Sequence, residues 1–139
     1  MKDYRKANLA GSDLRDMDLT NIDFRRANLA NVNLSGSNIK NCDFTSANLR
    51  GANLNGTDLR ATNLRGVDLS YTDLRNANLE GADLSGTKLH NANLEGSNLA
   101  KVYIRGTDIR GVDFSNVNLK DAIIKLIYDG KYKRVSSLV

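Results

Sequence analysis

The chain has 139 residues, of which 40% are hydrophobic, and this is enough material for one domain with a core of its own. No apolar run approaches the roughly 20 residues that cross a bilayer, the opening residues lack the apolar stretch of a signal peptide, and the single cysteine, Cys42, cannot form an internal disulfide. We therefore expect a soluble, cytoplasmic protein that has no membrane partner.

The net charge of +4 and the pI of about 9.3 would suit a nucleic-acid-binding protein if the basic residues gathered on the folded body. They gather at the two ends instead. Residues 1–6 carry three basic residues and one acidic residue, residues 122–139 carry four and one, and residues 7–121 carry 13 and 14. The body is therefore almost neutral, which disfavours nucleic acid as its partner.

Residues 7–121 repeat every five residues, beginning ANLAG SDLRD MDLTN, in 23 units without an insertion. Each central position, from Leu9 to Leu119, is Leu, Phe or Ile, and the residue two positions before it is usually small or β-branched. These two side chains share one side of an extended segment. Because a period of five fits neither a helix nor a continuous strand, we expect short extended segments that are joined by corners.

The last position of each unit predicts those corners. Glycine and asparagine predominate there, and both tolerate the positive φ of a type II turn. Ten of the eleven glycines occupy this position: Gly11, Gly36, Gly51, Gly56, Gly66, Gly81, Gly86, Gly96, Gly106 and Gly111. The chain has no proline, which suits a structure whose backbone N–H groups donate to neighbouring coils.

This pattern resembles the motif of the pentapeptide-repeat family, which is a small residue, Asn or Asp, Leu or Phe, and two variable residues. The resemblance covers residues 7–121 and implies an all-β fold, a right-handed quadrilateral parallel β-helix (β-solenoid) of four units per coil and about six coils. In that geometry Phe24 and Phe44 lie one coil apart and can stack, while Met17 and Cys42 point inward.

The two ends depart from the repeat. Residues 1–6 continue the five-residue frame, but Lys2 is a poor inward residue, so we expect an N-terminal cap or frayed unit before the body of a domain that spans residues 1–121. After residue 121 the frame breaks, and residues 122–139 are predicted to form a short capping helix and a basic tail. Asp121 is the expected N-cap of this helix and Gly130 its stop.

The apolar residues of the predicted C-terminal helix are candidates for a cap on the last coil or for a homodimer contact. They are Ile123, Ile124, Leu126, Ile127 and Tyr128. The resemblance supports the second alternative, because the C-terminal module of several family members makes a dimer contact.

We find no catalytic, cofactor-binding or metal-binding motif, and we expect no enzymatic activity and no cofactor. The only histidine, His90, takes an outward position and Cys42 an inward one, so they cannot form a nucleophile–base pair. Asp73, Glu95 and Asp113 share one predicted side of the coils. Uninterrupted coils leave no evident cleft in which such carboxylates could exclude water.

Three functions remain open, and a rigid, non-enzymatic scaffold for an unknown protein partner is favoured because the others lack residues that they require. Its candidate contacts are Tyr71, Lys88 and Tyr103, where large residues replace the common Gly, Asn or Asp.

The second alternative comes from the resemblance, because well-known family members imitate DNA and protect or inhibit DNA gyrase. The most acidic predicted side of this chain carries a net charge of only about −3, against about 16 phosphate charges on a duplex of the same length. The third alternative is weak nucleic-acid or anion binding through the basic ends. One predicted side also carries outward arginines near Tyr103, namely Arg25, Arg26, Arg65 and Arg105. Aspartates on the same side largely cancel their charge.

Overall fold

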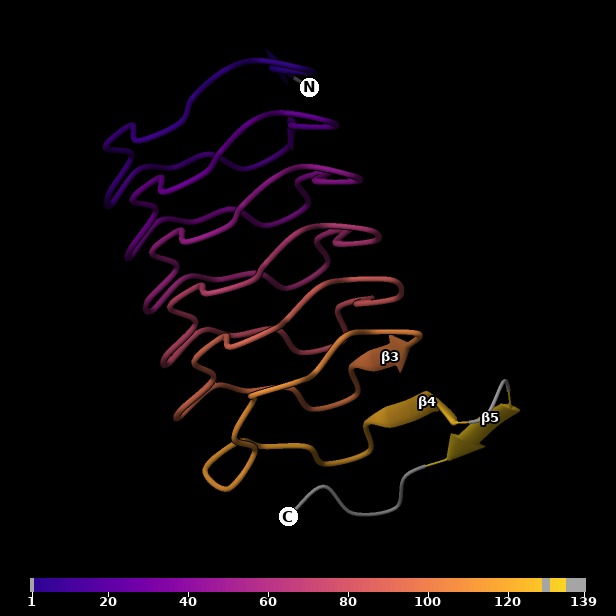
Figure 1. The fold of residues 1–139 in the computed structure, drawn as a ribbon. Coiled ribbons are helices and arrows are strands. Elements are labelled where there is room, and N and C mark those ends of the chain that lie inside the picture. The colour runs from indigo at the N-terminus through magenta and orange to yellow at the C-terminus, as the bar shows by residue number, and fades with distance from the viewer. Residues whose placement is uncertain (1, 129–130, 135–139) are drawn as a thin grey trace.

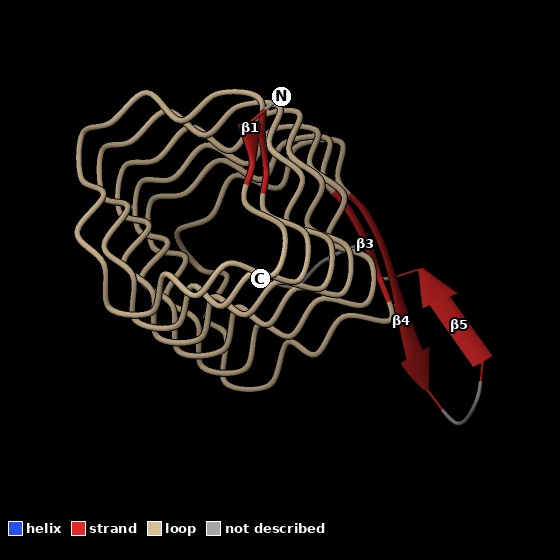
Figure 2. Ribbon diagram, turned by 90° about the horizontal axis from the view of Figure 1, so that it is seen from above, coloured by secondary structure: helices blue, strands red, loops and turns tan. Residues whose placement is uncertain are grey.

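The protein is a stack of similar coils around a common axis, as seen in a computed structural model that describes residues 2–128 and 131–134, with side chains described as far as Lys125. The N-terminus lies at one end of the stack and the last strands at the other (Figure 1). Viewed along the axis, successive coils superimpose on a similar outline (Figure 2). The described residues form no helix, and therefore none that could cross a membrane.

Five short strands lie at the two ends of the stack. At the N-terminal end, β1 (Lys2–Asp3) pairs in parallel with β2 (Ile22–Asp23). At the C-terminal end, β3 (Tyr103–Arg105) pairs in parallel with β4 (Ile123–Tyr128), and β4 pairs antiparallel with β5 (Lys131–Arg134). The all-β expectation is confirmed.

Between these strands the coils are joined by isolated parallel bridges between residues 20 positions apart, such as Asn28 with Asn48. Twenty residues are four five-residue units, as the resemblance implies. Each bridge uses two backbone bonds: the N–H of Leu29 donates to the carbonyl of Asn48 at 2.7 Å, and the N–H of Asn48 donates to the carbonyl of Ala27 at 3.0 Å. The Asn/Asp position of the motif is thus the position that pairs.

Each unit ends in a tight corner. The N–H of Ala27 donates to the carbonyl of Phe24 at 2.9 Å, closing a turn whose third residue, Arg26, has a positive φ of 59°. Some corners need glycine for a further reason. A Cβ atom at Gly51 would lie 2.3 Å from Oδ1 of Asn31, the corner residue of the coil before it. The predicted corner every five residues is confirmed.

The central residues of the units fill the interior in columns, and most of the leucines among them are fully buried. Phe24 and Phe44 stack with their ring centroids 5.0 Å apart and their planes tilted by 11°, as predicted. Inward polar side chains donate to backbone carbonyls: the Sγ of Cys42 to Leu19 at 3.0 Å and the Oγ1 of Thr57 to Leu54 at 2.7 Å. The predicted inward position of Cys42 is confirmed.

The first coil is less well covered than the interior coils. Met17 was expected to point inward and pack in the interior, but the residue is 45% exposed, and Tyr4 is 40% exposed although its ring packs 5.8 Å from that of Phe24. The expectation that Met17 packs in the interior is wrong. The next residue in its row, Ser37, is buried because it lies between two coils, whereas no earlier described coil covers Met17.

The prediction of a C-terminal helix is wrong, because Ile123–Tyr128 form strand β4. Residues 122–126 continue the five-residue frame, with Ile124 buried at the centre and Ile123 exposed at the pairing position. The N–H of Ile123 donates to the carbonyl of Val102 at 2.8 Å, as in the coils before it. Asp121 has a φ of 59° and is a corner rather than a helix cap. A helix here would leave the backbone edge of β3 unpaired, and β-branched residues favour strands.

Some predictions about the C-terminus concern parts that lie outside the described residues or side chains. Gly130, the predicted helix stop, and residues 135–139 of the predicted tail are among them. The backbone of Leu126, Ile127 and Tyr128 belongs to β4.

Candidate interaction surface

A recurring hydrogen-bonded pair orders the outward surface. In a unit that reads Asp-x-Arg around its centre, the aspartate carboxylate accepts bonds from both the backbone and the side chain of the arginine two residues later. Asp23 is typical: Oδ1 accepts from the backbone N–H of Arg25 at 3.1 Å and from its Nε at 2.9 Å, and Oδ2 accepts from Nη2 at 2.7 Å. We call this arrangement the Asp–Arg clasp.

Six units of the described residues contain the clasp, with Oδ2–Nη2 distances of 2.6 to 2.7 Å. They are Asp3–Arg5, Asp13–Arg15, Asp23–Arg25, Asp58–Arg60, Asp73–Arg75 and Asp108–Arg110. Exposed ion pairs of this kind contribute little to stability. Their main consequence is that they fix the direction of the guanidinium groups and cancel charge locally.

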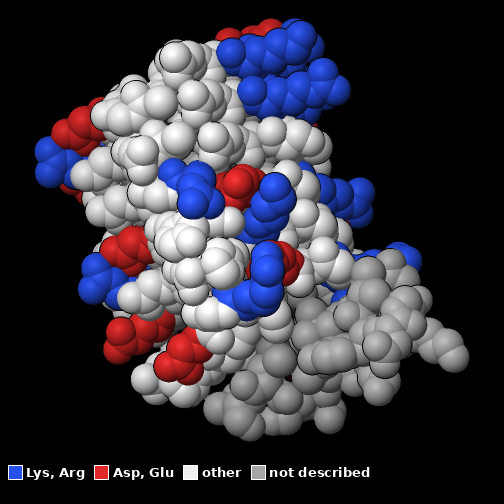
Figure 3. Space-filling model, viewed as in Figure 1, with Lys and Arg blue, Asp and Glu red and all other residues white. Residues whose placement is uncertain are grey.

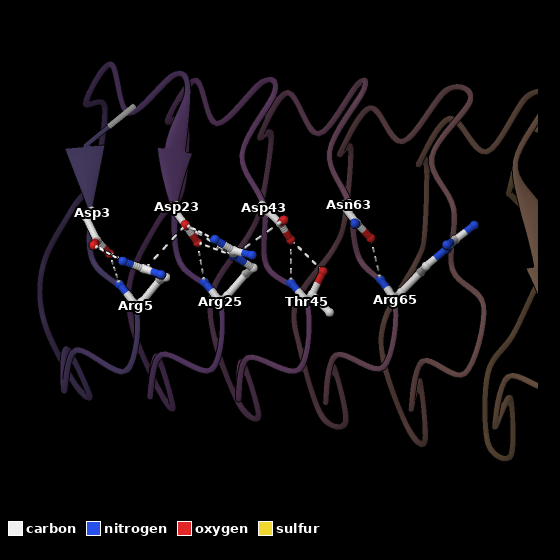
Figure 4. Close-up of polar contacts among 8 residues, drawn as sticks. All are labelled: Asp3, Arg5, Asp23, Arg25, Asp43, Thr45, Asn63 and Arg65. Carbon is white, nitrogen blue, oxygen red and sulfur yellow. Dashed lines mark hydrogen bonds and ion pairs between the residues drawn. The ribbon is translucent and has the colours of Figure 1, made fainter.

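On one side of the stack the clasps join into a continuous ladder, and we call this side the Asp–Arg face (Figure 4). Its pairing positions, one coil apart, are Asp3, Asp23, Asp43, Asn63, Asp83, Tyr103 and Ile123. Arg5 lies 3.7 Å from Asp23, and Arg25 lies 3.8 Å from Asp43, so the carboxylates and guanidinium groups alternate along the axis. The hydroxyl of Thr45 donates to Asp43 at the end of this ladder.

The clasps lower the pKa of the carboxylates that they hold. Hydrogen bonds from Arg5 lower the pKa of Asp3 to about 2, and hydrogen bonds from Arg110 do the same for Asp108. Hydrogen bonds from Arg25 likewise lower the pKa of Asp23. These groups stay ionised at any pH at which the protein would be studied as a binder.

These pKa shifts predict acid sensitivity. A carboxylate whose pKa is lower in the folded chain than its ordinary value of 3.8 stabilises the fold fully above that value, and this contribution is lost as the pH falls through about 2. We expect the urea midpoint of unfolding to fall between pH 4 and pH 2. An Asp108→Asn variant, which has no carboxylate to protonate there, should show a shallower fall, and an identical pH profile for the two proteins would contradict a stabilising clasp.

The four arginines predicted to share one side all lie on the Asp–Arg face, but they do not form one site. Arg25 is clasped by Asp23, and Arg65 donates to Asp83 of the next coil at 2.6 Å. Arg26 is exposed and forms no ion pair with the described residues, while Arg105 is exposed in β3. Tyr103 is half-buried, and its backbone pairs with Asp83 of the coil before it and with Ile123 of the coil after it. Figure 3 shows the resulting pattern, with mixed charge over the coils and basic side chains gathered near the N-terminal end.

Tyr71 and Lys88 lie on a different side of the stack. Tyr71 is a corner residue, 47% exposed, and the guanidinium of Arg50 lies 4.4 Å from the centre of its ring. The ring of His90 meets Tyr71 edge-on at 5.5 Å. Lys88 is exposed and pairs through its backbone with Asp68. The three scaffold candidates named from sequence therefore occupy two sides of the stack. Tyr71 and Lys88 share one side, and Tyr103 lies on the Asp–Arg face.

The groups weighed for chemistry do not assemble into a reactive centre. Burial raises the pKa of the Cys42 thiol to about 11, which keeps the group protonated. Asp73 is clasped by Arg75, while Glu95 and Asp113 line a shallow hollow where the bridge between residues 93 and 113 is missing. Among the described residues, no three His, Cys, Asp or Glu side chains could together hold a metal ion.

Comparisons with known proteins agree with this geometry. The family model described as "Pentapeptide repeats (8 copies)" matches residues 7–45, 42–81 and 82–121. The chain is similar to the crystal structure of a pentapeptide repeat protein, Rfr23, from the cyanobacterium Cyanothece 51142, with 27% identity over 88% of this chain and 91% of the other and a TM-score of 0.65. It is also similar to alr5209, a pentapeptide repeat protein from Nostoc Pcc 7120, with 26% identity over 81% and 84% and a TM-score of 0.58. A search of curated proteins gives no match.

Proposed function

Because the chain belongs to the pentapeptide-repeat family, we propose that it works as a rigid, non-enzymatic scaffold that presents its outward side chains to a protein partner in the cytoplasm. The observation that carries the proposal is the alternating ladder of the Asp–Arg face, in which Arg5 and Arg25 are fixed by carboxylates of their own unit and approached by those of the next coil. Side chains that are already ordered lose little conformational entropy when a partner binds, so such a surface favours specific contact.

The same clasps favour a scaffold over a DNA mimic. A protein that imitates DNA needs a dense field of uncompensated negative charge. Here six aspartates are each bonded to an arginine of their own unit, so their field is cancelled within a few ångströms. A gyrase subunit is therefore a disfavoured partner for this chain.

The proposal predicts that the full-length protein captures a specific protein. We would immobilise it, pass cytosolic lysate over it with and without nuclease, and identify the retained proteins by mass spectrometry. We expect at least one protein to be retained after nuclease treatment. Two variants on different sides serve as matched controls: Tyr71→Ala removes the ring beneath Arg50, and Arg65→Ala removes the bond to Asp83.

If the Asp–Arg face or the side that carries Tyr71 binds the partner, the variant on that side should lose the captured protein and the other variant should keep it. Retention of nothing, or only of material that nuclease removes, would contradict the scaffold proposal. Capture of gyrase subunits that survives nuclease would overturn the charge argument and establish the DNA-mimic function.

A further inference from the structure

A shallow hollow lies at the N-terminal corner of the Asp–Arg face. It is lined by Arg5, Lys6, Arg25, Arg26, Thr45 and Ser46. The lining residues come in adjacent pairs from three successive coils, so that each coil contributes one residue beside its centre and one at its corner. Four of the six side chains are cationic, and we call this set the cationic corner.

The two residues of each cationic pair have different surroundings. Arg5 and Arg25 are clasped by Asp3 and Asp23, so their charge is compensated and their direction is fixed. Lys6 and Arg26 are exposed and form no ion pair with any described residue. They are corner residues with the same φ of 59°, one coil apart. Successive coils lie about 4.8 Å apart, so two positive charges stand near each other without an anion between them.

The fold does not require these two charges. The corner needs a positive φ, which glycine adopts at less cost than Lys or Arg, and the same corner position in later coils is Gly66, Gly86 and Gly106. The neighbouring corner residue is Ser46, whose exposed hydroxyl has no hydrogen-bond partner among the described residues. Uncompensated donors around a hollow are suited to an anion that comes from outside the chain.

The row of corner residues that begins with Lys6 and Arg26 carries few cations, and this indicates what kind of anion fits. The cations occupy two coils, a serine follows, and the row then continues as three glycines that have no side chain to offer. Asp43 and Asp83 lie on the same face and pair with Arg25 and Arg65, so this face offers a longer polyanion little uncompensated positive charge beyond the corner. A nucleic-acid strand needs cations that follow its backbone, whereas a few acidic side chains of a protein need only a short row.

We propose that the cationic corner binds a short run of acidic residues on the protein partner, with the partner's carboxylates on Lys6 and Arg26. This inference rests on the proposed scaffold function and adds the chemistry of the bound segment. The clasped Arg5 and Arg25 form a fixed wall of the hollow, and the hydroxyl of Ser46 offers a neutral donor at its far side.

Fluorescence polarisation tests the proposal with a labelled hexaglutamate peptide, a hexaglutamine peptide of the same length and a six-residue oligothymidylate, each in about 50 mM salt, where exposed charges are weakly screened. We expect hexaglutamate to bind, hexaglutamine not to bind and the oligonucleotide to bind more weakly than hexaglutamate. The double variant Lys6→Gln, Arg26→Gln should bind hexaglutamate at least tenfold more weakly.

The matched control is the double variant Lys40→Gln, Lys120→Gln, which removes the same charge from two other cations that form no ion pair within the described part of the chain. It should bind hexaglutamate as the unaltered protein does. Equal weakening by both double variants would show attraction by net charge alone and overturn the assignment. Tighter binding of the oligonucleotide, lost in the corner variant, would make the corner a nucleic-acid contact instead.

The two proposals fail in different ways. If the corner variant loses hexaglutamate binding but still captures the same lysate protein, the scaffold function stands and the corner is not where that partner binds. If the unaltered protein captures nothing from lysate, the scaffold function falls, and the peptide assay still decides whether the corner binds acidic residues.

Discussion

Replacing Phe44 with alanine is expected to lower the free energy of unfolding by about 3 to 5 kcal/mol, the usual range for a buried aromatic side chain. Phe44 is fully buried and stacks on Phe24, so the substitution removes the ring contact and leaves a cavity between coils. The coils cannot easily close this cavity because backbone bonds on every side hold their spacing. Equilibrium urea unfolding, followed by circular dichroism, measures the change.

Tyr4 provides the matched control for Phe44, because it is the aromatic residue two coils earlier in the same column and is 40% exposed. Tyr4→Ala should cost about 1 kcal/mol, the contribution of one aromatic pair with little cavity formation. Equal losses for the two variants would mean that burial between coils does not determine the stability of this column.

Replacing Asn48 with proline is expected to destabilise the protein by about 3 kcal/mol or more. The N–H of Asn48 donates to the carbonyl of Ala27 in the preceding coil at 3.0 Å, and proline has no such donor. The proline ring would also occupy the space in which that carbonyl approaches. We expect a lower urea midpoint and faster hydrogen exchange at the backbone amides of residues 27–29, which flank the broken bridge.

Asn8→Pro is the control for this substitution, because Asn8 takes the same position of the first coil and no earlier described coil offers an acceptor to its N–H. Both substitutions remove a side-chain oxygen that accepts from the backbone N–H two residues later, that of Ala10 for Asn8 and that of Arg50 for Asn48. Asn8→Pro also removes the acceptor of a bond from Nδ2 of Asn28. Asn8→Pro should therefore cost much less. Similar losses would show that the proline ring, rather than the bridge, causes the damage.

The body of the fold could be predicted from sequence because one short pattern determines several levels of structure. A buried residue every fifth position, with a corner after it, leaves few ways to bring like residues together. The stacking of Phe24 on Phe44 and the inward thiol of Cys42 followed from that pattern. Resemblance to a known family supplied the four-sided coil, which the bridges between residues 20 positions apart now display.

The ends and the surface could be predicted less well, for physical reasons that a repeat does not contain. The segment after Asp121 has helix-like apolar spacing, but the free edge of β3 pairs with it as β4. Met17 has the right position for burial but no covering coil. The Asp–Arg clasp depends on how a turn brings residues i and i+2 together, and Asp-x-Arg spacing alone does not reveal this geometry. The six recurrences of that tripeptide were the available signal.

The 20-residue register also restricts how the length of this chain can change. Removing 20 residues would shorten the rod by one coil and leave every outward row continuous. Removing five residues would preserve the buried columns but move each later side chain to the next side of the stack, so that Arg65 would no longer follow Thr45 in the row shown in Figure 4. A viable core therefore does not guarantee a conserved surface, and only whole-coil changes in length keep both.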